Sequence, residues 1–137
     1  MENLWRSPET SSVNRLPMLN IEHPTYVSLD GIWNFQLLSN PNAENGSEWQ
    51  TIPVPGLWTM IDGEQPFGDK PIYTNTQMPW DYFPPNVPED NPTGIYERTF
   101  HLSDNLAAKR VVLQIGATES VHLLYINCQA VGAGKDS

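Results

Sequence analysis

Carboxylates are the most abundant groups in this sequence that could carry acid–base or nucleophilic chemistry. The chain has 16 Asp and Glu residues against 7 Lys and Arg residues, which gives a formal net charge of −9. A catalytic pair needs two carboxylates held at a fixed separation by neighbouring helices or strands. The adjacent pair Glu89 and Asp90 lies in a proline-rich stretch with no predicted element to hold it. We therefore interpret this pair as a solvated loop and predict no catalytic residue within the chain.

Asn75 and Asp136 are the two polar residues that could bind a ligand, and each also has an ordinary structural interpretation. The amide of Asn75 offers two donors and an acceptor, a set that suits the neighbouring hydroxyls of a sugar. Asn also stabilises turns through its own backbone, and the residues around Asn75 taken alone favour that interpretation. The carboxylate of Asp136 suits a hard cation, although the default for an exposed Asp is a plain surface charge.

The aromatic residues near the centre of the chain could form a stacking platform for a sugar ring. They are Trp58, Trp80, Tyr82 and Phe83. Aromatic side chains in a proline-rich loop more often pack that loop onto its own domain, and we favour packing here. The three histidines are His23, His101 and His122. Their spacing is not that of a metal site, and Cys128 has no His or Cys neighbour at ligand spacing, so we predict an inert thiol.

Length and charge exclude several classes of protein. The 137 residues allow one domain at most, since domains average about 150 residues. The deficit of Lys and Arg argues against nucleic-acid binding and against an anionic membrane surface. No apolar run approaches the roughly 20 residues that span a bilayer, and residues 1–15 lack the apolar stretch of a signal peptide. The single cysteine excludes an internal disulfide, and together these features predict a cytoplasmic protein.

Proline content and strand patterns indicate an all-β fold around these residues. The chain has 13 Pro residues, about twice the usual frequency of roughly 5%, and proline breaks helix interiors. Alternating polarity predicts a first strand over Gly31–Leu38. Further strands are predicted over residues 51–55, 95–102, 110–115, 121–126 and 129–131.

Two of these strands and the end of the chain bear on the sheet order. The prolines within 51–55 confine that strand to an edge, whereas apolar residues on both faces of 121–126 predict a central strand. Residues 132–137 have the composition of a loop. Because a β-sandwich commonly needs about seven or more strands, the sequence predicts an incomplete domain.

Five stretches of the chain carry a family resemblance, and they occur in the family's order. They are Ser28-Leu29-Asp30-Gly31-Ile32-Trp33-Asn34-Phe35, Val54-Pro55-Gly56-Leu57-Trp58, Pro71-Ile72-Tyr73-Thr74-Asn75, Asn91-Pro92-Thr93-Gly94-Ile95-Tyr96, and residues 116–132 followed by Lys135-Asp136-Ser137. Upstream lie Trp5, Pro8 and Val13-Asn14-Arg15-Leu16. The chain resembles the N-terminal part of Lac-type β-galactosidases of glycoside hydrolase family 2 over almost its whole length.

The resemblance implies a fold and a division of the chain. The fold is a jelly-roll-like antiparallel β-sandwich of the galactose-binding-domain type. Residues 1–25 would form an extended N-terminal arm of the kind that supports α-complementation. Residues 26–137 would form the sugar-binding sandwich without its final strands. The family's catalytic Glu pair belongs to a later TIM-barrel domain, so the chain alone is expected to be inactive.

The resemblance also implies site residues, ions and partners. Asn75 and Asp136 fall where the family contacts the galactosyl group, and Asp136 falls where it helps to ligate sodium. Sodium and magnesium are implied for the complete enzyme, which would be a homo-oligomer that includes the TIM-barrel part of the chain. Its reaction would be retaining hydrolysis of terminal β-D-galactosides such as lactose.

Three alternative functions stay open, and one turn departs from the family's pattern. The chain could be a stand-alone carbohydrate-binding module, the same domain of a related enzyme such as a β-glucuronidase, or a scaffold or interaction fragment with no sugar role. The family commonly has Asn-Gly at its last hairpin turn, whereas this chain has Asn127-Cys128. A non-Gly residue with positive φ is destabilised by roughly 1 kcal/mol or more.

Overall fold

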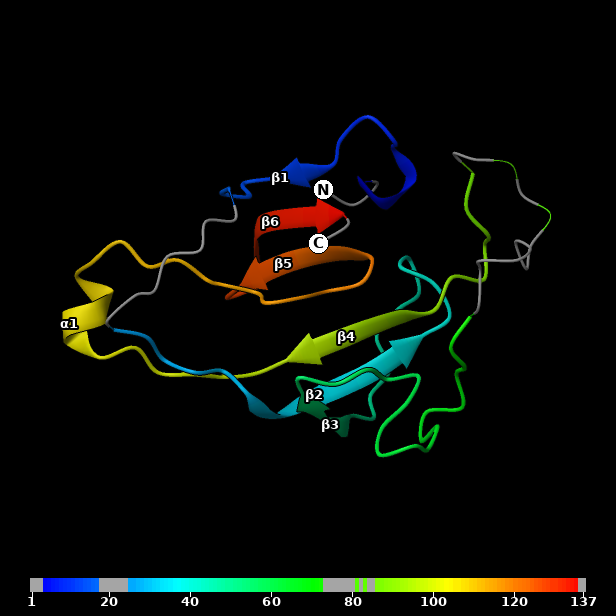
Figure 1. Cartoon of the computed structure of the whole chain (residues 1–137), viewed down its shortest axis with the longest axis horizontal. Coiled ribbons are helices and arrows are strands. Elements are labelled where there is room, and N and C mark those ends of the chain that lie inside the picture. The colour runs from blue at the N-terminus through cyan, green and yellow to red at the C-terminus, as the bar shows by residue number, and fades with distance from the viewer. Residues whose placement is uncertain (1–3, 18–24, 73–80, 82, 84–85, 136–137) are drawn as a thin grey trace. The chain divides into compact units, whose positions relative to one another are not determined.

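A computed structural model describes residues 4–17, 25–72, 81, 83 and 86–135 (Figure 1). The described residues form two compact units. The β2 unit holds those from Thr25 to His101 except Asn86, and the β6 unit holds the remainder. Each unit contains one three-stranded antiparallel sheet, which confirms the predicted all-β class. None of the helices in the described ranges is long and apolar enough to cross a membrane.

The β2 unit is built on the order β3-β2-β4. Strand β2 spans Gly31–Leu38, as the alternating polarity predicts, and β3 spans Gln50–Val54. Strand β3 lies at the edge and carries Pro53, which confirms the edge position expected from its proline content. Strand β4 spans Thr93–Glu97, so it begins earlier and ends earlier than predicted.

Arg98, the residue after β4, binds the backbone just before the start of β2. The Arg98 guanidinium Nη1 donates to the carbonyl oxygens of Leu29 at 2.7 Å and Asp30 at 2.8 Å. The indole Nε1 of Trp33 donates to the same Leu29 oxygen at 2.7 Å. Because hydrogen bonds from a charged donor are among the stronger ones, Arg98 fixes the direction from which β2 begins.

An aromatic cluster forms the core of the β2 unit. Phe35 in β2 is fully buried, and its ring centroid lies 4.5 Å from that of Phe67, 5.0 Å from Tyr96 and 6.3 Å from Trp58. Gly94 in β4 leaves room for this packing, since a Cβ there would lie 2.9 Å from both Phe35 Cε2 and Trp58 Cε3. The loop residues Trp58 and Phe67 are thus packed onto the sheet by rings from two strands.

The β6 unit is built on the order β1-β6-β5, preceded by a short 3₁₀ turn η1 at Leu4–Arg6. Strand β1 spans Ser12–Val13, β5 spans Val121–Ile126 and β6 spans Gln129–Lys135, while α1 is a single turn at Asp104–Ala107. The N-terminal residues 12–13 therefore contribute an edge strand to this sheet.

Three sequence predictions for this unit are wrong. The last strand does not end at residue 131: β6 continues to Lys135, because its small residues 132–134 are buried between β1 and β5. Strand β5 is therefore an edge strand of the described sheet, not a central one. Residues 110–115 form no strand, because no other described segment pairs with them, and an unpaired strand is not stable in water.

Strands β5 and β6 are joined by a two-residue turn. Asn127 has φ 49° and Cys128 has φ 61°, and the flanking pair is Ile126 with Gln129. Positive φ at both central residues is the type I′ geometry, which matches the twist of a hairpin. The turn therefore keeps the left-handed conformation that favours Gly, although Cys128 occupies the second position.

Candidate functional site

The two residues proposed to touch a sugar lie outside the described residues. Asn75 falls in the range 73–80, and Asp136 is one of the last two residues. The structure describes the segment that leads into Asn75 as far as Ile72, and β6 as far as Lys135. The site can therefore be built only from the groups that precede these residues.

Asp69 anchors the segment that leads into Asn75. Its Oδ2 accepts a hydrogen bond from the indole Nε1 of Trp58 at 2.6 Å, and its Oδ1 accepts one from the backbone N of Lys70 at 2.9 Å. The ring of Trp58 is itself packed against Phe35 and Tyr96, at centroid distances of 6.3 and 6.5 Å. The carboxylate thus joins residues 69–70 to the aromatic core.

The four aromatic residues for which packing and sugar stacking were weighed differ in their surroundings in the structure. Trp58 is part of the core cluster, so the packing interpretation is confirmed for this residue. Phe83 is 84% exposed and packs little within the described residues. Trp80 and Tyr82 lie outside the described residues. Of the four aromatics, Phe83 is the described ring that remains available to stack on a ligand.

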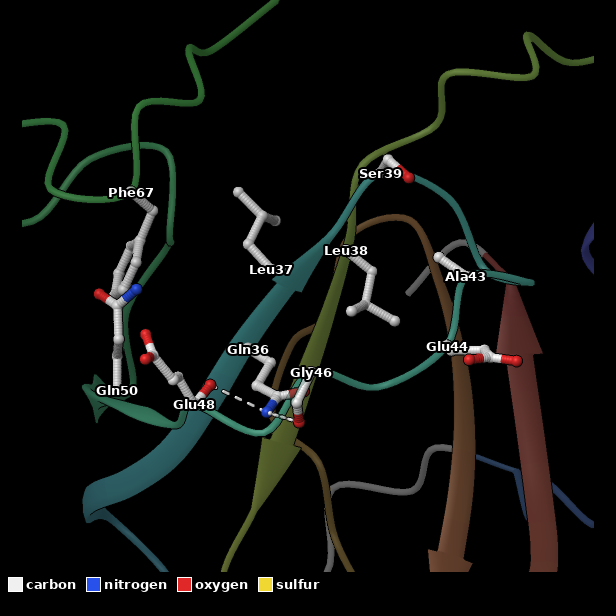
Figure 2. A pocket seen from close by; sticks show the side chains of 10 residues that line it. All are labelled: Gln36, Leu37, Leu38, Ser39, Ala43, Glu44, Gly46, Glu48, Gln50 and Phe67. Carbon is white, nitrogen blue, oxygen red and sulfur yellow. Dashed lines mark hydrogen bonds between the residues drawn. The ribbon is translucent and has the colours of Figure 1, made fainter.

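A cleft of about 440 Å³ lies at the end of β2 (Figure 2). Residues from β2, from the following loop, from β3 and from the aromatic cluster surround it: Gln36, Leu37, Leu38, Ser39, Ala43, Glu44, Gly46, Glu48, Gln50 and Phe67. A smaller cavity of about 260 Å³ shares Leu37, Leu38, Ser39 and Phe67 and reaches Asp69. Both cavities belong to the β2 unit.

Gln36 organises one wall of the larger cleft. The side chain is 5% exposed, and its Nε2 donates to the carbonyl oxygens of Gly46 at 2.7 Å and Glu48 at 2.9 Å, as the dashed lines in Figure 2 show. Its Oε1 is buried without a hydrogen-bond partner. The Gln36 side chain therefore holds the loop at residues 46–48 against β2 through its Nε2 alone.

The polar groups of the cleft include two carboxylates, those of Glu44 and Glu48. In Figure 2 the carboxylate of Glu48 points toward Gln50 and Phe67, whereas the carboxylate of Glu44 points away from those two residues. Glu89 and Asp90 are both exposed in a loop, as the sequence predicts. No group of three or more His, Cys, Asp or Glu residues that could hold a metal ion occurs within the described ranges.

His122 lies on β5 against the backbone of β6. A Cβ built on Gly134 would lie 2.6 Å from His122 Cε1, so the imidazole packs directly on this glycine. Its Nδ1 is buried without a hydrogen-bond partner. Burial lowers the pKa of His122 below its usual value, and the positive charge of Arg15 lowers it further. His122 is thus half-buried in the β5–β6 hairpin, while His23 lies outside the described residues and His101 is exposed.

Two functional candidates were missed by sequence reasoning. Gln36 alternates with Phe35 on β2, and the loop that covers it could not be predicted from strand periodicity. Asp69 lies two residues before the stretch that begins at Pro71, and a tryptophan eleven residues upstream is its partner. An acidic residue close to the start of a family motif was the available signal.

Comparison with known proteins gives one family and a consistent set of relatives. The profile described as "Glycosyl hydrolases family 2, sugar binding domain" matches residues 26–137. A β-galactosidase of Kluyveromyces lactis is 38% identical over 148 aligned positions, covering 99% of this chain and 14% of the relative. A β-galactosidase of Vibrio cholerae is 39% identical over 119 positions, covering 80% and 11%, and one of Vibrio vulnificus is 38% identical over 157 positions, covering 97% and 14%. The chain therefore spans between 11% and 14% of the length of these relatives.

Proposed function

Because the chain belongs to the family 2 glycosyl hydrolases, through their sugar-binding domain, we propose that it is the N-terminal sugar-binding portion of a β-galactosidase. The complete protein would hydrolyse terminal β-D-galactosides such as lactose with retention of configuration. The observation that carries the proposal is the match over nearly the whole chain to enzymes of that name in both a yeast and bacteria.

The chain would contribute binding groups rather than the reacting carboxylates. Asn75 would present its amide to the galactosyl hydroxyls, and Asp136 would contact the sugar and share in a sodium site. The catalytic Glu pair would come from another part of the protein. This division is supported by the exposed, loop-bound Glu89 and Asp90, which have no geometry for retaining hydrolysis.

The setting of the complete protein follows from the same proposal. It would be a homo-oligomer in the cytoplasm, and sodium and magnesium would be its ions. The N-terminal arm has a structural counterpart in β1, which pairs with β6 through Ser12 with Gly134 and Val13 with Ala133. This pairing supports a role for the arm in assembly.

The test is Asn75→Ala in the complete protein, assayed on a chromogenic galactoside. A neutral hydrogen bond contributes about 0.5–1.5 kcal/mol net, so kcat/KM should fall roughly 2- to 15-fold with the melting temperature unchanged. The 137-residue chain alone should release no product. A wild-type protein without galactosidase activity would refute the proposal. A lowered melting temperature with normal kcat/KM would show that Asn75 stabilises a turn and does not contact the sugar.

A further inference from the structure

Both oxygens of the Asp69 carboxylate accept hydrogen bonds from groups of its own unit. One oxygen accepts from the Trp58 indole at 2.6 Å and the other from the Lys70 backbone N at 2.9 Å. Asp69 is half-buried, and it lines the smaller cavity beside Phe67. Hydrogen bonds to an ionised acceptor are stronger than neutral ones, so this anchor resists displacement.

Both ends of the anchor are well defined. The Trp58 ring contacts the buried cluster through Phe35 and Tyr96, and it also covers Gly94, where an added Cβ would lie 2.9 Å from Cε3. On the other side, Pro71 follows Lys70 directly and fixes its own φ near −65°. The direction in which the chain leaves the anchor is therefore restricted from residue 69 to residue 71.

We infer that Asp69 is a positioning residue of the galactoside site, acting through Trp58 on the segment that carries Asn75. The inference rests on the proposed function, since Asn75 is the group whose placement matters. Asn75 follows Asp69 by six residues, so a change in the anchor changes the start of the path to Asn75. Misplacement by about 1 Å lowers enzymatic rates by up to about 10²-fold.

A second indole in the same unit provides a matched control. Trp33 Nε1 donates to the Leu29 carbonyl at 2.7 Å, at the entrance of β2. Trp33→Phe and Trp58→Phe each remove one indole hydrogen bond and keep most of the ring area. Only the bond of Trp58 reaches the segment that leads to Asn75, so the pair separates positioning from stability.

The experiment measures steady-state kinetics and melting temperature on the complete protein. The variants are Asp69→Ala, Asp69→Asn, Trp58→Phe, Trp33→Phe and the double variant Asp69→Ala with Trp58→Phe. Asp69→Ala should raise KM for a chromogenic galactoside about tenfold, and Asp69→Asn, which keeps one acceptor oxygen, should be intermediate. The double variant should be no worse than the worse single variant, because both remove one contact. Trp33→Phe should lower the melting temperature and leave KM unchanged.

Hydrogen exchange keeps the inference separate from the proposed function. Exchange of the backbone amides of Gly68, Asp69, Lys70 and Ile72 should rise in Asp69→Ala and Trp58→Phe but not in Trp33→Phe. If the wild-type protein hydrolyses galactosides and Asp69→Ala leaves KM within twofold of wild type, the inference is overturned while the function stands. If the wild-type protein lacks that activity, the galactoside role of Asp69 falls together with the function. Unchanged exchange in Asp69→Ala would overturn the anchor itself.

Discussion

Gly94→Ala should destabilise the β2 unit through steric crowding alone. The φ of Gly94 lies outside the left-handed range, so an alanine can adopt its backbone conformation without strain. The new Cβ would nevertheless lie 2.9 Å from Phe35 Cε2 and from Trp58 Cε3, and 3.0 Å from Trp58 Cζ3. Ordinary contact begins at 3.4 Å, so each ring would have to move by about 0.5 Å.

Neither ring is free to move by that amount. Phe35 is fully buried and contacts Phe67 and Tyr96, while the indole of Trp58 is bonded to Asp69 at 2.6 Å. Overpacking of this kind destabilises a core by about 1–3 kcal/mol. For a chain of this size, each kilocalorie corresponds to roughly 3–6 °C of melting temperature.

Gly46→Ala is the matched control in the same unit. Its Cβ would meet nothing closer than Gln36 Nε2 and Glu48 N, both at 4.0 Å. Urea denaturation followed by near-ultraviolet circular dichroism should give a lower midpoint for Gly94→Ala than for Gly46→Ala, with equal slopes. Equal midpoints for the two variants would show that the aromatic cluster yields easily, and would refute the argument from fixed rings.

Three further outcomes are expected. Cys128→Gly should stabilise the hairpin by about 1 kcal/mol in urea denaturation, because glycine has no Cβ and adopts the φ of 61° without steric strain. An unchanged midpoint would contradict this. Gln36→Glu should destabilise more than Gln36→Met, because a carboxylate would face the carbonyl oxygens of Gly46 and Glu48; the reverse order of melting temperatures would contradict the assigned bonds. The pKa of His122 is lowered in the folded state, so the unfolded state binds the proton first and stability should fall as pH drops below about 6.5. His122→Phe should flatten that part of the curve of unfolding free energy against pH.

Local periodicity predicted the strands that carry their own pattern. Strand β2 alternates and was predicted at both ends, and the prolines of β3 predicted its edge position. The hairpin turn at Asn127 and Cys128 was also located. These features depend on residues close together in the sequence, so their signal is present in a short window.

Features that depend on distant partners could not be predicted in the same way. The small residues 132–134 have loop composition, yet they form part of β6 because β1 and β5 lie on either side. The β-branched run at 110–115 was predicted as a strand, but strand formation needs a partner that the pattern does not specify. The Trp58–Asp69 bond likewise joins residues whose proximity is decided by packing on Phe35.

The pairing of β1 with β6 sets an order of events during synthesis. The Asn14 side chain bonds the Val131 carbonyl across a separation of 117 residues, and a ribosome adds about 5–20 residues per second. The arm is therefore made first but waits roughly 6–23 s for its strand partner. The β2 unit, which is almost continuous in sequence, can form during that interval. Until β6 emerges, the arm lacks the strand with which it pairs in the folded chain.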